Sequence, residues 1–125
     1  MTTEKIGKTM KIGIATYDEF KARTMAIARG EVTPGADEPK VWFPSTESFA
    51  RVLSRKNRAL LATIAETHPE SLQELAERTG RRVSNLSRTL RTMERYGFVS
   101  LTKGVRGRIR PEVPYRAISL ELMLN

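Results

Sequence analysis

The feature that most constrains the fold is a series of helix start and stop signals between residues 45 and 97. Ser45 and Ser71 are good N-caps, and Gly80 and Gly97 are natural helix stops. Between these signals apolar residues recur at spacings of three and four, the period of an amphipathic helix. The pattern therefore predicts four short helices that share one core, because each has a single apolar side.

We expect these helices at about 46–53, 56–67, 72–79 and 84–96. His68-Pro69 should end the second helix, since proline lacks an N–H and restricts the residue before it. Ser71 and Glu74 form a capping box for the third, and Ser84 can cap the fourth. The residues expected on the buried sides are Phe49, Val52, Leu53, Leu60, Leu61, Ile64, Ala65, Leu72, Leu75, Ala76, Thr79, Leu86, Leu90 and Met93.

A basic hairpin is predicted after the last helix. Phe98–Thr102 has the pattern of a strand, and Val113–Leu120 that of its partner strand, although Pro114 limits pairing there. Between them lies a glycine-containing turn over residues 103–111. Alternation predicts that three arginines project from one side of this hairpin, namely Arg106, Arg108 and Arg110.

In the N-terminal third of the chain the sequence predicts a smaller segment that contains a strand and a helix. Residues 10–15 alternate like a short strand, and Thr16 or Asp18 can open a helix that runs to about Arg29. After a loop with two prolines, Val41-Trp42-Phe43 is a second apolar run, which favours core or dimer packing over a ligand cage. The predicted buried stripe of the helix is Phe20, Met25 (or Thr24), Ile27 and Ala28.

Charge is confined to one part of the chain. Residues 81–116 hold ten basic residues and two acids, so their net charge of +8 equals that of the whole chain. Charge segregated onto consecutive elements is typical of a site for a polyanion. A sequence pI near 10.3 likewise predicts an acidic partner, either nucleic acid or an acidic protein.

Three segments in a fixed order carry a resemblance to a known family. Leu72–Gly80 looks like a positioning helix, Ser84–Leu90 like the start of a recognition helix, and Met93–Val99 like the junction into a wing. Over residues 45–125 the chain resembles the winged helix-turn-helix domain of MarR-like bacterial and archaeal regulators. The resemblance implies an α+β fold in which helices are followed by a β-hairpin wing.

A narrower resemblance involves Arg110–Tyr115 and the N-terminal segment. These are similar to DNA-binding proteins encoded beside toxin genes, such as the TumA antitoxin of the TumE–TumA pair. This resemblance implies a type II antitoxin that represses its own operon and binds a small toxin protein. We expect a DNA-binding domain at 45–125, and at 1–44 a segment that forms the homodimer or binds the partner.

The expected DNA-binding residues lie on the last helix, the turn before it and the wing. Asn85 can pair with adenine and Arg88 with guanine in the major groove, so these two are the predicted base readers. Arg81 and Arg82 are expected on phosphates beside the helix N-terminus. The full set is Arg81, Arg82, Ser84, Asn85, Ser87, Arg88, Thr89, Arg91, Thr92, Arg95, Lys103, Arg106, Arg108 and Arg110.

Several function classes are disfavoured by composition. The chain has one histidine and no cysteine, which excludes disulfides, thiolate catalysis and sites that need two imidazoles. No metal-ligand spacing or phosphate-binding glycine motif is present, so we expect no enzyme activity, no cofactor and no metal. No apolar run approaches the roughly 20 residues that span a membrane, and the lack of cysteine fits a reducing cytoplasm.

Three other readings stay open. The protein could be an interaction module whose basic face binds an acidic partner, or a ligand-responsive MarR-like regulator. The latter needs a pocket, which this chain could form around Trp42, Phe43, Phe49 and Tyr17. RNA binding is weakly supported, because the strands lack an exposed aromatic platform.

Overall fold

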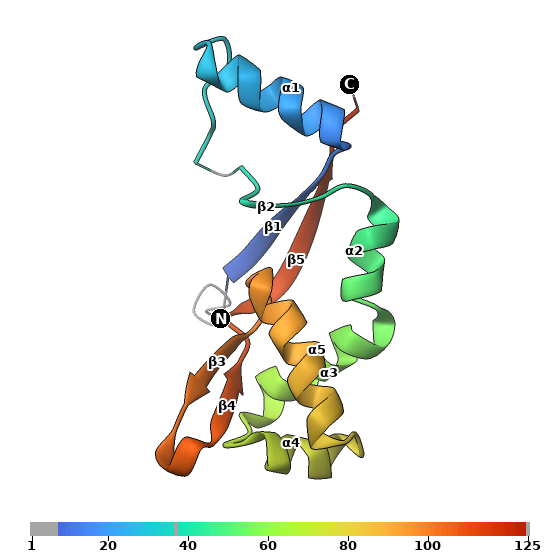
Figure 1. Ribbon diagram of the computed structural model, residues 1–125, viewed down its shortest axis with the longest axis vertical. Coiled ribbons are helices and arrows are strands. Elements are labelled where there is room, and N and C mark those ends of the chain that lie inside the picture. The colour runs from blue at the N-terminus through green and yellow to red at the C-terminus, as the bar shows by residue number, and fades with distance from the viewer. Residues whose placement is uncertain (1–7, 37, 125) are drawn as a thin grey trace, which may run out of the picture. The chain divides into compact units, whose positions relative to one another are not determined.

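The structure, a computed structural model, describes residues 8–36 and 38–124 (Figure 1). The fold is α+β. The chain divides into two compact units: a helical unit (Met1–Lys8 and Val52–Arg116) and a sheet unit (Thr9–Arg51 and Ala117–Asn125). The described elements are β1 (Lys8–Ile14), α1 (Tyr17–Ala28), β2 (Val41–Phe43), α2 (Thr46–Val52), α3 (Arg55–Thr67), α4 (Leu72–Thr79), α5 (Val83–Arg95), β3 (Ser100–Lys103), the 3-10 turn η2 (Val105–Gly107), β4 (Ile109–Glu112) and β5 (Tyr115–Leu122).

Three parallel strands form the sheet unit, in the order β2-β1-β5. Gly13 of β1 lies opposite Trp42 of β2, and a β-carbon added to that glycine would meet the indole ring at 2.3 Å. Trp42 and Phe43 are successive strand residues, so they point to opposite faces. Phe20 of α1 packs against Trp42, and Phe49 of α2 packs edge-on to Phe43. Each face of the sheet is therefore contacted by one helix.

Helix α1 begins where the sequence predicted but does not pack as predicted. Thr16 is its N-cap, in a reciprocal capping box with Glu19. No residue of α1 is buried, and Met25 of the expected stripe is 45% exposed. Gly13 offers this helix no side chain to pack on, and the Trp42 ring packs against Phe20 near the start of the helix.

The helical unit confirms most of the predicted core. Leu60, Leu61 and Ile64 of α3 and Leu72 and Leu75 of α4 are buried, and so are the three apolar residues of α5, Leu86, Leu90 and Met93. Ala65 is exposed, so its place in the predicted core is wrong. Ala65 follows Ile64 on the helix, so its side chain lies beside the apolar stripe that faces the core and not within it.

Two predicted caps differ from the structure. The Ser71 hydroxyl accepts from the Glu74 amide as expected, but the Glu74 carboxylate accepts from the Glu70 amide rather than from that of Ser71. Arg82, not Ser84, is the N-cap of α5, and it makes no side-chain cap hydrogen bond. Helix α5 therefore begins directly after the turn, with Ser84 already inside its first turn.

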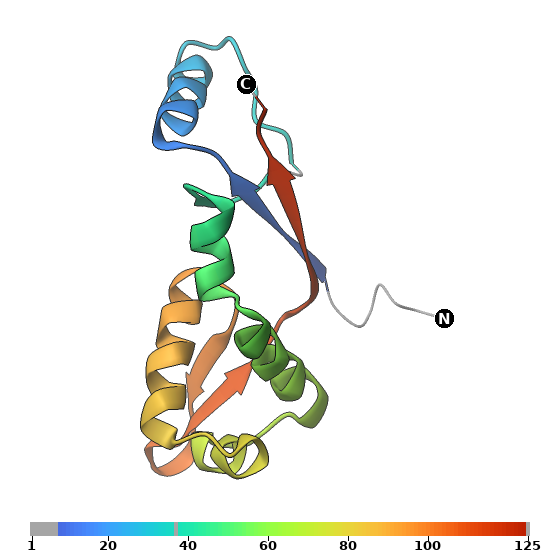
Figure 2. The same cartoon turned by 90° about the vertical axis from the view of Figure 1, so that its right-hand side faces the viewer.

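The predicted partner strand of the hairpin, Val113–Leu120, is wrong. Strand β3 pairs antiparallel with β4, which places Leu101 opposite Pro111 and Thr102 opposite Arg110. Residues 115–122 instead form β5, which runs beside β1 and points the same way (Figure 2). Pro114 explains the break: it has no N–H to donate, so the hairpin ladder stops before it and the chain leaves for another sheet.

The two compact units differ from the predicted division at residues 44 and 45. The sheet unit contains most of α2 and the segment after Arg116, both of which the sequence assigned to the DNA-binding domain. Strand β5 accounts for the second difference, because it is the neighbour of β1 in the three-stranded sheet. Sequence continuity could not show this long-range pairing.

Candidate nucleic-acid interface

Helices α4 and α5 are joined by a turn of three residues, Gly80 to Arg82. Gly80 has a φ of 74°, and its amide donates to the Ala76 carbonyl at 2.8 Å. This left-handed conformation has a small conformational energy for glycine and a larger one for any residue with a side chain. Two helices joined by a turn of three or four residues that contains glycine are typical of a helix-turn-helix motif.

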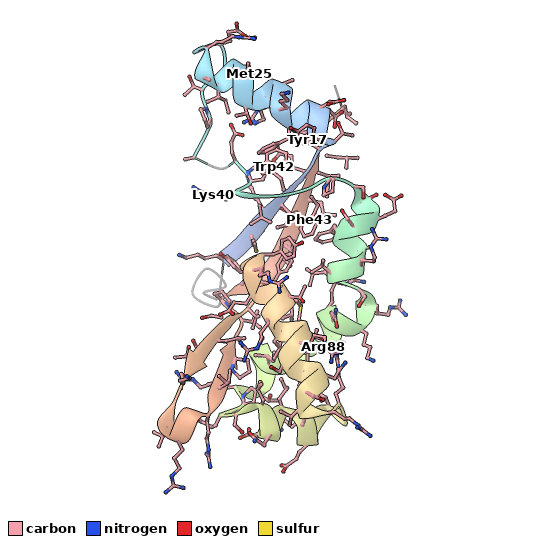
Figure 3. The ribbon with its side chains drawn as sticks, in the orientation of Figure 1. Tyr17, Met25, Lys40, Trp42, Phe43 and Arg88 are labelled. Atoms are coloured by element: carbon pink, nitrogen blue, oxygen red, sulfur yellow. The ribbon has the colours of Figure 1, made fainter. Side chains whose placement is uncertain are left out.

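Helix α5 has one fully buried side and one basic side. Leu86, Leu90 and Met93 are each 0% exposed. With about 3.6 residues per turn, the opposite side carries exposed residues at positions 84, 88, 91 and 95, three of which are arginines. The Arg88 side chain makes no hydrogen bond or ion pair with any residue that the structure describes, and Figure 3 shows it on α5. Arg88 is therefore free to meet a ligand.

Arg81 orients the flank of α5. Its Nε donates to Asn85 Oδ1 at 2.9 Å, and its Nη2 donates to Thr89 Oγ1 at 3.4 Å. All three residues are half-buried. Asn85 therefore has its side-chain oxygen already engaged, while its amide hydrogens stay available. The predicted base-reading pair is thus unequal: Arg88 is unengaged, and Asn85 is held in place by Arg81.

The other predicted residues of α5 lie around the basic side. Arg91 Nε donates to Ser87 Oγ at 3.1 Å, which holds its guanidinium along the helix. Thr92 Oγ1 donates to the Arg88 carbonyl at 3.2 Å, so that hydroxyl is used within the helix. Arg82, Ser84 and Arg95 are exposed.

The tip of the hairpin is a compact turn rather than a simple alternation. The Gly104 amide donates to the Arg108 carbonyl at 2.6 Å, and Arg106 has a positive φ of 61°. Of the three alternating arginines only Arg110 lies in a strand, because Arg106 belongs to η2 and Arg108 follows it. Strand alternation, from which a common side was predicted for the three arginines, therefore does not apply at Arg106 and Arg108.

Acidic side chains offset part of the hairpin's charge. Arg110 Nη2 lies 3.3 Å from Glu112 Oε2 in an exposed ion pair. Arg106 and Arg108 line an open groove of about 550 Å³ together with Glu74 and Glu77 of α4. Acids therefore lie beside most of the basic residues of this hairpin, and Lys103 is its one predicted site residue without such a neighbour among the described residues.

The comparison with protein families rests on this helical unit. Residues 52–120, more than half of the chain, match the HVO_A0114 family. The chain belongs to the HVO_A0114 family. No curated protein and no solved structure matches it. The HVO_A0114 match covers α3, α4, α5, the hairpin and the first part of β5, so the candidate interface lies within the family region.

The HVO_A0114 region also holds basic residues that the sequence reasoning missed. Lys56 of α3 and Arg78 of α4 line a groove of about 280 Å³ together with Arg81. Arg78 is also 3.6 Å from Glu74, in an exposed pair. These residues lie outside the contiguous basic stretch, so a charge count along the chain could not find them. Arg81 is the link between this groove and α5.

Charge in this HVO_A0114 protein divides between the two units. The helical unit holds sixteen basic and seven acidic residues, a net charge of +9, whereas the sheet unit holds six basic and seven acidic residues, a net charge of −1. A polyanion would therefore be attracted to the helical unit alone.

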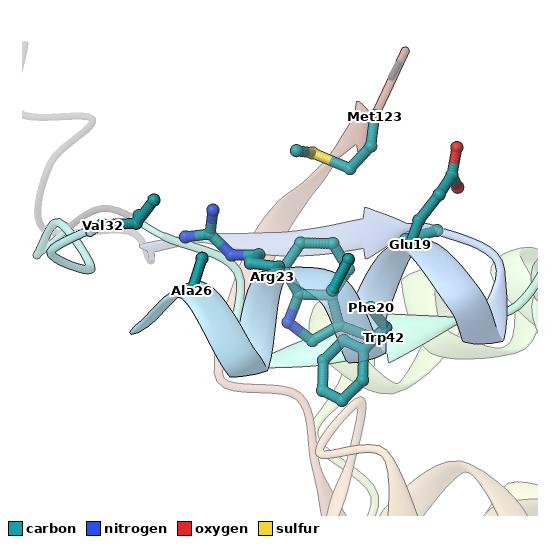
Figure 4. Close-up of a pocket in the computed structure, with 9 residues that line it drawn as sticks. Glu19, Phe20, Arg23, Ala26, Val32, Trp42 and Met123 are labelled. Atoms are coloured by element: carbon teal, nitrogen blue, oxygen red, sulfur yellow. The ribbon is translucent and has the colours of Figure 1, made fainter. Parts of the chain in front are cut away.

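A cavity of the sheet unit lies beside Trp42 (Figure 4). Its volume is about 240 Å³, and its wall includes Phe20, Arg23 and Met123. Arg23 is already ion-paired with Glu38. Ligand pockets usually have about 300–1,000 Å³, so this one is small for an effector. Of the four aromatic residues predicted to form such a pocket, only Trp42 lines it.

No group of three or more histidine, cysteine or acidic side chains among the described residues could hold a metal ion. No described helix has the length and apolar character needed to cross a membrane.

Proposed function

We propose that this protein is a sequence-specific, double-stranded DNA-binding transcription regulator built on a winged helix-turn-helix. One observation carries the proposal: α5 buries Leu86, Leu90 and Met93 completely and exposes Arg88, Arg91 and Arg95 on its other side, directly after a three-residue turn. A B-form major groove is about 12 Å wide and admits one α-helix. A helix that enters it must have this division between a buried and a polar side.

The roles of the residues follow from what each already contacts. Arg88 is unengaged, and an arginine pairs bidentately with the O6 and N7 of guanine. Arg81 fixes the Asn85 side chain, whose amide hydrogens can still be donated to a base acceptor. Lys56, Arg78 and Arg82 are proposed phosphate contacts. The β3–β4 hairpin would grip the backbone as a wing, with less net charge than its arginine count suggests.

The regulatory consequence is repression by exclusion. A protein bound over a promoter blocks polymerase sterically, and this requires no effector pocket. The cavity beside Trp42 is small and its arginine is paired, which makes a ligand-responsive regulator the less favoured reading.

Selection of binding sites from random duplexes tests this proposal. The full chain should enrich a motif, and Arg88→Ala should weaken binding to that motif by about 1–3 kcal/mol while relaxing preference at one base position. Arg29→Ala removes the same charge from an exposed site in the sheet unit and should leave the motif affinity nearly unchanged. Equal losses for Arg88→Ala on motif and random duplexes would show that α5 only holds the backbone.

A second role, as the antitoxin of a toxin–antitoxin pair, is favoured by helix α1. It buries none of its residues, and Tyr17 and Met25 are 72% and 45% exposed (Figure 3). Apolar side chains on a unit with almost no net charge suit a protein partner better than DNA. Co-expression with the product of the adjacent gene tests this: Tyr17→Ser with Met25→Ser should lose the complex and keep DNA binding. An adjacent gene product that never copurifies would remove the antitoxin role.

A further inference from the structure

Strand β5 is a long edge strand without the usual protection. It has eight residues and is the neighbour of β1 on one side, while no described strand pairs with its other side. Natural sheets protect such an edge with lysine, proline or a bulge. β5 contains no lysine and no proline, and its only charged residues are Arg116 and Glu121. The opposite edge, β2, has only three residues and offers little backbone for pairing.

One face of β5 is an exposed apolar row. Side chains alternate along a strand, so Ile118, Leu120 and Leu122 share a face. Leu120 and Leu122 are 47% and 53% exposed, and Ile118 is half-exposed. Met123 has the opposite parity and lines the cavity beside Trp42 (Figure 4). The apolar row therefore belongs to the face away from that cavity.

Charge points to a second copy of this chain as the occupant. The sheet unit has a net charge of −1, so two copies of it meet without appreciable repulsion, whereas two helical units of +9 each repel one another. From Ile118 to Leu122 this row carries no charge, and Arg116, which has the same parity, lies before it near the start of β5. An apolar edge of this kind is complementary to itself, as a twofold interface requires.

We propose that the free edge of β5 pairs antiparallel with β5 of a second copy, with the twofold axis at Leu120. In this register Leu120 lies opposite Leu120 of the partner, and Ile118 lies opposite the partner's Leu122. A register centred on Glu121 would place two carboxylates side by side, which is unfavourable. The pair joins two three-stranded sheets into one of six strands. The inference does not rest on DNA binding, but it would supply the twofold assembly that helix-turn-helix regulators use on paired half-sites.

Single cysteines test the register directly, because the chain has none of its own. Two cysteines can join only when their Cα atoms are within about 7 Å. Leu120→Cys places two thiols across the axis, so mild oxidation should give a covalent dimer. Leu122→Cys is the matched control from the same row: the two copies are offset by about 13 Å along the strands, so it should crosslink far more slowly. Equal crosslinking of both variants would overturn the register.

Light scattering on the full chain without DNA tests the pairing itself. The wild type should be dimeric at tens of micromolar, and Leu120→Lys should be monomeric, because two ammonium groups would meet at the axis. Val105→Lys adds the same charge at a residue that is 79% exposed in the helical unit, and it should stay dimeric. Circular dichroism checks that all three are folded. A monomeric wild type, or a Leu120→Lys protein that stays dimeric, would overturn the proposal whether or not the protein binds DNA.

Discussion

Single arginines of the helical unit differ in what already neutralises them. Arg88 has no partner among the described residues, whereas Arg110 is paired with Glu112. Arg106 and Arg108 share a groove with two glutamates. A count of arginines therefore overestimates the positive charge that the hairpin offers to DNA, relative to that of α5. The contribution of an arginine to a DNA interface depends on the acidic residues beside it.

Glu77 tests this view of the hairpin tip. Glu77→Gln removes an acid from the groove that Arg106 and Arg108 line, so DNA affinity should rise by about 0.2–1 kcal/mol, the range of an exposed charge pair. Titration of a short duplex at low salt measures it. Glu47→Gln makes the same change in the sheet unit and serves as the control. Equal gains from both substitutions would mean that only net charge matters.

Gly13 sets the packing of the sheet unit through Trp42. Because a β-carbon at Gly13 would lie 2.3 Å from the indole ring, Gly13→Ala must displace the ring or the strand. We expect a loss of about 1–3 kcal/mol of stability and a changed emission spectrum of Trp42, the only tryptophan in the chain.

Gly35→Ala is the control for this substitution. The nearest atom to its added β-carbon would be a flexible side-chain carbon at 3.7 Å, an ordinary contact. Denaturation followed by tryptophan fluorescence compares the two variants. An unchanged spectrum and midpoint for Gly13→Ala would contradict the packing of Trp42 on β1.

At the scale of elements, the connection between α4 and α5 decides how α5 is presented. Gly80 ends α4 in the left-handed region, with a φ of 74°. Any other residue at this position is strained, although open space surrounds the missing side chain. The strain therefore comes from the backbone and not from packing.

Gly80→Ala should cost about 1–2 kcal/mol of stability, the penalty for a non-glycine residue in this conformation. Gly104→Ala is the comparison, since Gly104 has a φ of −105° and its added β-carbon would be 3.6 Å from the nearest atom. Urea denaturation of both variants measures the difference. The expectation fails if the two midpoints shift equally.

The elements also show what the sequence could and could not predict. Helices α3, α4 and α5 were predictable because caps and apolar spacing are local signals, as with Ser71 and Gly80. The partner of β3 was not, because residues 109–112 and 115–122 are both extended and strand pairing is decided by distant parts of the chain. Pro114 marked the break but could not show that β5 would join β1. The position of Glu74 and Glu77 beside the hairpin tip was not predictable either, because it results from tertiary packing between α4 and the hairpin.

At the scale of the whole molecule, the two units differ in net charge. The helical unit carries +9 and the sheet unit −1. The first is suited to a polyanion, and the second to contacts between proteins. The HVO_A0114 match covers Val52–Arg116 of the helical unit and stops within β5, so the candidate interface lies in the part of the chain that matches the family.

The salt dependence of duplex binding tests the central claim most directly. If the protein neutralises about 6–10 phosphates through the helical unit, its affinity should fall by about 10³–10⁵ between 50 and 200 mM salt. Arg88→Ala should lower the affinity for a selected motif with little change in the slope, Arg82→Ala should make the fall less steep, and Arg29→Ala should change neither. A steep, linear decrease of the logarithm of affinity with the logarithm of salt concentration is the result that we predict. A flat response, or no duplex binding at low salt, would contradict the assignment of this basic surface to DNA.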